Sequence, residues 1–305
     1  MVLMPVLIGV DWGTSSFRAY LINRDGGVVD FISTAEGILS VRDGDFESVF
    51  ERLLADWLRD YSSLPVLLSG MITSKNGWFE VDYVQVPAEV SSIASALAAF
   101  KTSRGRKLHF VTGLAVTGAE MAPDVMRGEE TELIGQICHH DSDGLFLLPG
   151  THSKWVRVKD HRILDFQTFM TGEVYALLKQ HSILGKLMSC DSESSEAFDR
   201  GVLWRTAHSA SILHVLFSVR TFPLFGQMDS EHVADYLSGL LIAEEISGML
   251  NSWEKLAEVT VIGRGDLAGR YCRALGLMGV NAIAAPQGMV ARGHYELARQ
   301  RGLIE

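Results

Sequence analysis

The sequence predicts an α/β fold in two domains, and three observations support this. A unit of strand, small polar turn, strand, turn and strand occurs over residues 6–33 and again over 145–168. Helical segments and short buried strands follow each unit. The length of 305 residues allows two medium-sized cores. A duplicated unit is typical of two similar domains, so we expect domains at 1–140 and 141–305.

The first half begins with strands and continues with alternating helices and strands. An apolar run at 6–10 predicts a buried strand, and the alternation along 17–22 predicts a strand that returns beside it. Apolar residues at helical spacing predict the helices. The expected elements are strands at 6–10, 17–22, 28–33, 64–68 and 108–111, helices at 46–57 and 90–100, and a helix that follows 126–133 and ends near 139.

The second half repeats the opening pattern and then becomes mostly helical. A polar break at 141–144 precedes the second set of strands. The expected elements are strands at 145–148, 155–158, 163–168, 259–262 and 281–284 and helices at 173–184, 194–208, 230–253 and 267–275. Pro286 to Gly288 open a final helix that ends near residue 301. We expect this C-terminal segment, 286–305, to pack back on the N-terminal domain.

The charge, the cysteines and the apolar pattern of the chain argue against several classes of protein. The net charge of −10 and the lack of a Lys/Arg run argue against a nucleic-acid-binding surface. The three cysteines, Cys138, Cys190 and Cys272, lie far apart and lack metal-binding spacing, which suits a reducing compartment. We find no signal-peptide pattern and no apolar stretch long enough to span a membrane. The sequence therefore predicts a cytoplasmic protein without a membrane partner.

The turn that follows the first strand carries groups suited to a nucleotide's phosphates. Asp11 ends the strand and could hold a hydrated magnesium ion. Gly13 allows the backbone to approach an anion closely, and the hydroxyls that follow can donate hydrogen bonds. These donors are Thr14, Ser15 and Ser16. A plain polar hairpin is the alternative interpretation of this turn.

Two further glycine-marked turns also follow short buried strands. The turn at 149–154 repeats the small polar pattern of the first turn, with GTHS in place of GTSS. Its candidate phosphate donors are Gly150, Thr151, His152 and Ser153. The third turn, at 263–266, contains Gly263 and Gly265 and opens a helix, where an adenosine could lie against the backbone. The three turns in this order indicate nucleotide binding more strongly than any one of them.

The order of these turns resembles that of the sugar-kinase/hsp70/actin superfamily. More specifically, nearly the whole chain is similar to the 2-dehydro-3-deoxygalactonokinase family. Thr73 and Lys75 stand where we would expect Gly and Arg in that family, and the turn at 264–266 is more polar than expected. The stretches that carry the resemblance are IGVDWGTSSFRAYL, LSGMITSKNGW, MRGEETELIG, LLPGTHSKWV, FMTGEVYALL and IGRGDLAGRYCRALGL.

The resemblance implies a fold and an activity. The fold is α/β, with two ribonuclease-H-like domains of the actin-like ATPase type flanking a cleft. The activity is ATP-dependent phosphorylation of 2-dehydro-3-deoxy-D-galactonate at the C6 hydroxyl, a step of galactonate catabolism. Asp11 would hold Mg²⁺ through water, and the turns at 13–16 and 150–153 would hold phosphates.

The resemblance also implies a base and an acceptor pocket. We expect Glu129 or Glu130 to accept the proton of the attacking hydroxyl, with Asp11 as the next candidate. The alternative role for the two glutamates is to complement the helix dipole. A substrate with a carboxylate and a keto group calls for cationic and polar contacts. The candidates in the motif segments are Arg18, Ser69, Ser74, Lys75, Trp78 and Lys154.

Two other functions remain open at this point. A kinase of another sugar or sugar acid would use the same scaffold, because fold does not fix substrate. A nucleotide-switched binding protein would need a peptide- or DNA-binding appendage, and the sequence offers no segment for one. Nothing in the sequence indicates an oligomeric state.

Overall fold

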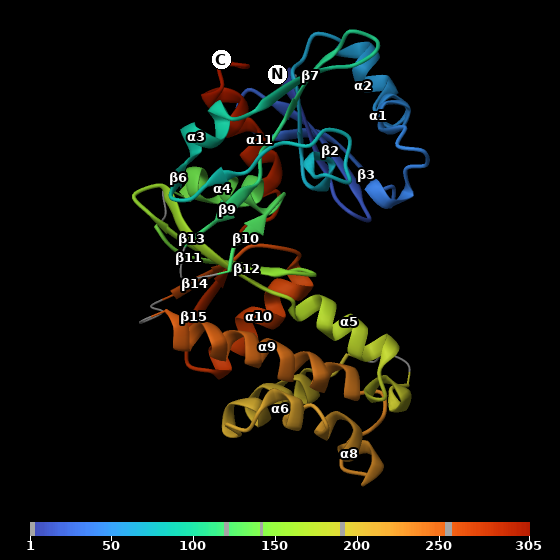
Figure 1. The fold of residues 1–305 in the computed structure, drawn as a ribbon, viewed down its shortest axis with the longest axis vertical. Coiled ribbons are helices and arrows are strands. Elements are labelled where there is room, and N and C mark those ends of the chain that lie inside the picture. Colours follow the sequence, from blue (N-terminus) through green and yellow to red (C-terminus); the bar gives the residue numbers. More distant parts are fainter. Residues whose placement is uncertain (1–3, 119–121, 141–142, 190–192, 254–257) are drawn as a thin grey trace. The chain divides into compact units, whose positions relative to one another are not determined.

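A computed structural model describes residues 4–118, 122–140, 143–189, 193–253 and 258–305, so Cys190 and Asp141 lie outside the described residues (Figure 1). The chain forms two compact units. The first comprises Met1–Asp143, Val156–Phe166 and Gly288–Glu305, and the second Gly144–Trp155 and Gln167–Gln287. Two segments that follow Gly144 in the sequence thus return to the first unit. The predicted domains at 1–140 and 141–305, with the C-terminal segment at 286–305 packing back on the N-terminal domain, stay a prediction.

The first unit contains a six-stranded sheet with the order β3-β2-β1-β4-β8-β7. The first three strands pair antiparallel, β1, β4 and β8 pair parallel, and β7 pairs antiparallel with β8 at the edge. This arrangement is the ribonuclease-H-like topology. The strands are β1 (Pro5–Trp12), β2 (Phe17–Asn23), β3 (Val28–Thr34), β4 (Val66–Ser69), β7 (Ala98–Lys101) and β8 (Lys107–Phe110).

The helix predicted over 90–100 is wrong beyond its first half. Helix α3 (Val90–Ser95) ends early, and the next residues form strand β7. Their alternating exposure fits an edge strand, with Ala98 and Phe100 packed against the core. The helix predicted over 46–57 is interrupted at Leu54, which separates α1 (Phe46–Leu53) from α2 (Ala55–Asp60).

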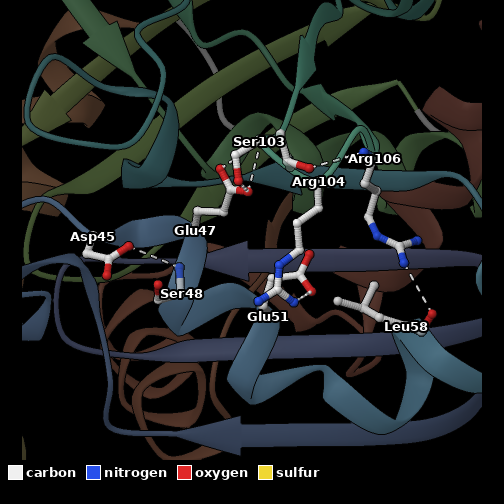
Figure 2. Close-up of polar contacts among 9 residues, drawn as sticks. Asp45, Glu47, Ser48, Glu51, Leu58, Ser103, Arg104 and Arg106 are labelled. Atoms are coloured by element: carbon white, nitrogen blue, oxygen red, sulfur yellow. Dashed lines mark hydrogen bonds and ion pairs between the residues drawn. The ribbon is translucent and has the colours of Figure 1, made fainter.

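One face of this sheet packs against α1 and α2 through an aromatic core. Trp12, Phe50 and Phe110 are fully buried in it. Side chains of α1 also hold the turn that joins β7 to β8. Glu47 accepts hydrogen bonds from the backbone N–H of Ser103 at 2.9 Å and from its hydroxyl, as Figure 2 shows.

On the other side of the unit, α4 (Glu129–His140) packs closely against α11 (Met289–Gln300). A Cβ at Gly135 would lie 2.0 Å from the carbonyl oxygen of Met289, and one at Gly293 would lie 1.8 Å from that of Thr131. Only glycine allows such an approach of two helix backbones. The first unit also holds three short strands that were not predicted. They are β5 (Val84–Gln85), β9 (Leu114–Val116) and β10 (Asp124–Met126).

The second unit is built on a parallel core of three strands. β11 (Gly144–Leu148) pairs with β14 (Glu258–Val261), which pairs with β15 (Asn281–Ala284). The whole sheet has the order β15-β14-β11-β12-β13-β6, the counterpart of the first sheet. Its remaining strands are β12 (Ser153–Lys159), β13 (Arg162–Phe169) and β6 (Ala88–Glu89), of which β6 pairs with β13 inside the first unit.

Helices complete the second unit. Two of them, α6 and α9, pack backbone to backbone, since a Cβ at Gly201 would lie 2.3 Å from the carbonyl oxygen of Tyr236. The short α7 and α8 were not predicted. The helices are α5 (Thr171–His181), α6 (Ser195–Ala207), α7 (Ile212–Val215), α8 (Ser218–Leu224), α9 (Val233–Ser252) and α10 (Gly265–Leu277).

The predicted α/β class with two ribonuclease-H-like sheets is confirmed. The cleft between the domains stays a prediction. None of the helices in the described part of the chain has the length and apolar character needed to cross a bilayer.

Candidate active site

Asp11 lies at the carboxyl end of β1, between two neighbouring strands. The sheet register places it beside Arg18 of β2 and Ser69 of β4. Arg18 Nη1 lies 3.6 Å from Asp11 Oδ2, and about a fifth of the Asp11 side chain (21%) is exposed. Burial raises the pKa of Asp11 to about 6, Arg18 opposes that shift, and Glu129 adds to it. Asp11 is therefore a carboxylate that can exchange a proton near neutral pH.

The turn after Asp11 is held by its own backbone. The N–H of Gly13 donates to the carbonyl of Ser16 at 2.9 Å, and the N–H of Leu39 donates to that of Thr14 at 3.2 Å. The side chains of Thr14 and Ser15 are exposed. The hydroxyls of Thr14 and Ser15 are thus presented to solvent on a fixed backbone, whereas the Gly13 N–H is used inside the turn.

Three backbone segments approach one another closely beside Asp11. Gly70 has φ +89°, and a Cβ there would lie 2.8 Å from the carbonyl oxygen of Trp12 and 3.0 Å from Asp11 Oδ1. Gly128 has φ +110°, and its Cβ would lie 3.1 Å from the Cα of Gly70. These glycines bring the ends of β1 and β4 and the start of α4 together.

The first turn of α4 carries three glutamates with different surroundings. Glu130 is only 1% exposed, and it accepts from the Gly128 N–H at 2.6 Å and from the Thr131 hydroxyl at 2.9 Å. Burial and Glu129 raise the pKa of Glu130 to about 7. Both carboxylate oxygens of Glu130 therefore accept hydrogen bonds inside the protein at the start of α4.

Glu129 and Glu132 lie on the side of α4 that faces Asp11. Glu129 is half-buried and accepts from the N–H of Arg127 at 3.0 Å. The pKa of Glu132 is raised to about 7 by burial, with smaller contributions from Asp11 and Glu129. The sequence analysis missed Glu132. Its position three residues after Glu129 places both on one helical face, which was a usable signal.

The candidate residues in the segment after β4 differ in their burial and in their contacts. Ser69 is fully buried, and its hydroxyl lies 2.9 Å from His294 Nε2 of α11. Ser74 donates to the carbonyl of Met71 at 2.7 Å, whereas Lys75 is exposed. Trp78 packs against Phe50, Phe100 and Phe110, so its ring belongs to the hydrophobic core. That placement does not support a role for Trp78 as the apolar face of a sugar site.

Arg127 holds this segment in place and was not predicted. Its Nη1 donates to the carbonyl and the hydroxyl of Thr73, both at 2.6 Å, and its Nη2 donates to the carbonyl of Val81 at 2.8 Å. The guanidinium lies 4.2 Å from the centre of the Tyr83 ring. Thr73, which departs from the expected family pattern, is thus a fixed structural contact.

The turn of the second unit is supported by a buried polar network. The Ser153 and Tyr271 hydroxyls lie 2.9 Å apart, and the Tyr271 hydroxyl donates to Glu245 at 2.7 Å. Trp155 Nε1 donates to the other Glu245 oxygen at 2.8 Å. Burial raises the pKa of Glu245, and these hydrogen bonds oppose that shift. Through the contact between Tyr271 and Ser153, this network holds the end of the turn at 149–154 in position.

The other residues of this turn are nearer the surface. Thr151 is exposed, and His152 Nε2 lies 2.5 Å from Glu173 at the start of α5. Gly150 approaches α5 closely, because a Cβ at Gly172 would lie 2.3 Å from its carbonyl oxygen. Lys154 is buried and donates to the Thr168 hydroxyl at 2.8 Å.

The third turn leads into α10. Gly263 has φ +157°, a Cβ there would lie 3.5 Å from the Pro149 ring, and its carbonyl accepts from Gln287 at 2.8 Å. Gly265 is the first residue of α10, and Arg264 pairs with Asp266 at 3.0 Å. Gly263 and Pro149, the residues that follow β14 and β11, are therefore neighbours within the second unit.

Among the described residues, no group of three or more His, Cys, Asp or Glu side chains could hold a metal ion. This excludes an all-protein metal cage within the described ranges.

The family model, the two relatives and the crystal structure to which this chain is similar all carry the same activity in their names. A family model for 2-keto-3-deoxy-galactonokinase matches residues 11–297. The 2-dehydro-3-deoxygalactonokinase of Escherichia coli (strain K12) is 35% identical over 277 residues, or 91% of each chain. A probable 2-dehydro-3-deoxygalactonokinase of Rhizobium meliloti (strain 1021) is 36% identical over 90% of each chain. A crystal structure from Sinorhizobium meliloti, provisionally assigned the same activity, has a TM-score of 0.87 and 34% identity, covering 96% of this chain and 98% of that one.

Proposed function

Because this chain belongs to the 2-keto-3-deoxy-galactonokinase family, we propose that it phosphorylates 2-dehydro-3-deoxy-D-galactonate. The phosphoryl group comes from ATP, and the acceptor is the C6 hydroxyl of the sugar acid. The product is 2-dehydro-3-deoxy-6-phosphogalactonate, formed in galactonate catabolism. The observation that carries the proposal within the chain is the group of Asp11, Glu129 and Glu132 around Arg18 at one end of the first sheet.

Glu129 is the proposed general base. A base must reach the substrate, and Glu130 is buried with both oxygens engaged. Glu129 is accessible at the start of α4 and raises the pKa of Asp11. Of the two glutamates expected from the sequence, Glu129 therefore fits the role. Asp11, with a pKa near 6, is the other candidate.

Asp11 is also the residue that would hold Mg²⁺, through water. When bound, Mg²⁺ neutralises charge on the phosphates during transfer. Asp11 fits this task because its side chain is partly open while Arg18 and the glycine-bordered backbone fix its position.

The nucleotide's phosphates are assigned to the two donor-rich turns. In the first unit, the hydroxyls of Thr14, Ser15 and Ser16 supply donors, and Gly13, whose N–H donates to Ser16, lets the backbone lie close to the phosphates. In the second unit, the donors come from the turn at Gly150, Thr151, His152 and Ser153. Gly263 and Gly265 are assigned to the adenosine, since the start of α10 leaves the backbone open there: a Cβ at Gly265 would meet nothing within 4 Å.

The acceptor's carboxylate and keto group are assigned to cationic side chains. Arg18 is 40% exposed beside Asp11, and Lys75 is exposed in the segment fixed by Arg127. Lys154 was also a candidate, but it is buried and donates to Thr168, so we assign it to holding the second turn rather than to the acceptor. Ser69 and Ser74 are assigned to positioning the segment after β4, because their hydroxyls are used inside the protein.

The test is ADP release with Mg-ATP and three acceptors: 2-dehydro-3-deoxygalactonate, 2-dehydro-3-deoxygluconate and glucose. Turnover on the first alone, with the phosphate located on C6 by ³¹P NMR, is the expected result. Turnover confined to glucose would mean another kinase on the same scaffold. ATP binding without turnover on any acceptor would contradict the proposed activity.

A further inference from the structure

The first unit has a second polar pocket, at the end of its sheet away from Asp11. It lies where residues 64–65 lead into β4 and where β8 begins at Lys107. The candidate active site lies at the carboxyl ends of β1 and β4, whereas this pocket lies at the amino ends of the parallel β4 and β8. Its volume of about 540 Å³ is enough for a small metabolite.

The pocket is positively charged although the chain carries a net charge of −10. Three cations and one histidine line it, and none of the described residues around it is a carboxylate. These lining residues are Arg104, Arg106, Lys107 and His109. An anion is the ligand class that such a lining favours.

The cations are only partly neutralised by the protein. Arg104 pairs with Glu51 at 3.2 Å, as Figure 2 shows. Within the described residues, Arg106 and Lys107 form no ion pair with a carboxylate. Lys107 also faces Lys101 across the antiparallel pair of β7 and β8. Two like charges opposite each other destabilise a sheet, and a bound anion would relieve this.

Arg106 is already fixed in position. Its Nη1 donates to the carbonyl of Ser62 at 3.0 Å. Its Nη2 donates to the carbonyl of Leu58 at 3.1 Å, the contact that Figure 2 shows. A guanidinium has five N–H donors, so others are left for a ligand. Because the side chain is held before binding, little rotamer entropy would be lost on binding.

His109 supplies an independent sign of a missing ligand. It is 5% exposed, lines the pocket, and its buried Nδ1 has no hydrogen-bond partner among the described residues. A buried polar atom without a partner is costly. Burial, Lys107 and Arg301 lower the pKa of His109, which favours the neutral ring, and the tautomer that protonates Nδ1 can donate a hydrogen bond.

We propose that this pocket binds a phosphate group, either inorganic phosphate or a small phosphate monoester, at a site separate from the candidate active site. A phosphate dianion matches one fixed guanidinium, an exposed ammonium and a neutral imidazole donor. The hydroxyls of Ser62 and Ser63 on the rim add further donors. The site goes beyond the proposed function and does not depend on it.

The test follows the imidazole signals of protein labelled with ¹³C-histidine during titration with sodium phosphate, at constant pH and ionic strength. His109→Asn identifies the signal of His109. We expect that signal to shift and saturate. Lys107→Gln should weaken binding roughly tenfold, the factor for one charge-assisted hydrogen bond, and Lys107→Glu should abolish it. Lys186→Gln, the same charge change on the exposed Lys186 of the second unit, should match the wild type.

Two further titrations separate the sources of the phosphate group. Tighter binding of glycerol 3-phosphate than of inorganic phosphate would point to a phosphate monoester, and the reverse would point to free phosphate. A His109 signal that never saturates, or equal binding by the wild type and Lys107→Glu, would overturn the proposal. Kinase activity of Lys107→Glu, measured separately, keeps this outcome distinct from a failure of the proposed function.

Discussion

The two phosphate-binding turns proposed here have nearly the same sequence but different support. In the first unit, backbone hydrogen bonds hold the turn at 13–16, and the carboxylates beside it remain partly accessible. In the second unit, Glu245 is buried and accepts hydrogen bonds from Trp155 and Tyr271, and Tyr271 contacts Ser153. The first arrangement leaves carboxylates for chemistry, whereas the second uses a carboxylate to hold the turn.

Among the variants that test this contrast between the two turns, Asp11→Asn should have the largest effect on activity. Loss of the charge proposed to hold Mg²⁺ would remove several kcal/mol of transition-state stabilisation, so kcat/KM should fall about 10³-fold. The protein should stay folded, because the amide keeps the shape of the carboxylate. Steady-state ADP release and circular dichroism measure the two properties.

The matched control is Asp56→Asn, a change of the same kind on the 80% exposed Asp56 in α2. Its activity should equal that of the wild type. Equal activity of Asp11→Asn and Asp56→Asn would remove Asp11 from the mechanism.

In the second unit, Glu245→Ala should instead reduce stability. It leaves the Trp155 N–H and the Tyr271 hydroxyl without an acceptor, which costs about 2–5 kcal/mol of unfolding free energy. The KM for ATP should rise, since Ser153 loses its support. Urea unfolding measures the first effect and initial rates the second.

The neighbouring Glu244→Ala removes only an ion pair with Arg205 and should cost less than about 1 kcal/mol. If both variants unfold alike, the network does not support the turn.

A smaller effect is expected when the backbone support of the first turn is disturbed. A Cβ at Gly37 would lie 2.3 Å from the carbonyl oxygen of Thr14. Gly37→Ala should therefore shift the turn, at a cost of about 1–3 kcal/mol, and raise the KM for ATP several-fold. Gly276→Ala, where a Cβ meets nothing within 4 Å, is the control. An unchanged KM in Gly37→Ala would show that this tether does not position the phosphate donors.

The smallest effect concerns pH. Folding raises the pKa of Asp11 to about 6 and the pKa values of Glu130 and Glu132 to about 7. The folded state therefore binds more protons than the unfolded state at mildly acid pH, and its stability falls as pH rises through these values. Urea unfolding of the wild type and Glu130→Gln across about pH 5 to 8 should show a weaker decline in the variant. An identical decline in both would contradict the raised pKa of Glu130.

Local pattern was enough to predict most of the fold. Apolar runs and alternation predicted β1, β2 and β3, and helical spacing predicted α9. The segment at 98–101 was missed because its strand depends on pairing with β8, a contact that helix-like composition conceals. The short β5 and β9 likewise exist only through pairing.

The candidate site was predictable where a motif marks the backbone. Asp11 and the small polar turns are marked in this way, and their roles stay predictions. Arg127 and Glu245 could not, because their roles depend on partners far along the chain, such as Thr73 for the first and Trp155 for the second. The assignment of Trp78 to a sugar contact shows the same limit, since only the fold places its ring among core aromatics.

The most direct test of the central claim compares kcat for Glu129→Gln and Glu130→Gln at saturating Mg-ATP and sugar acid. The two residues are neighbours, and each change removes one charge. If Glu129 accepts the proton, Glu129→Gln should lose roughly 10²–10⁴-fold in kcat, whereas Glu130→Gln should keep most of its activity. The opposite ranking, or full activity in Glu129→Gln, would contradict the account.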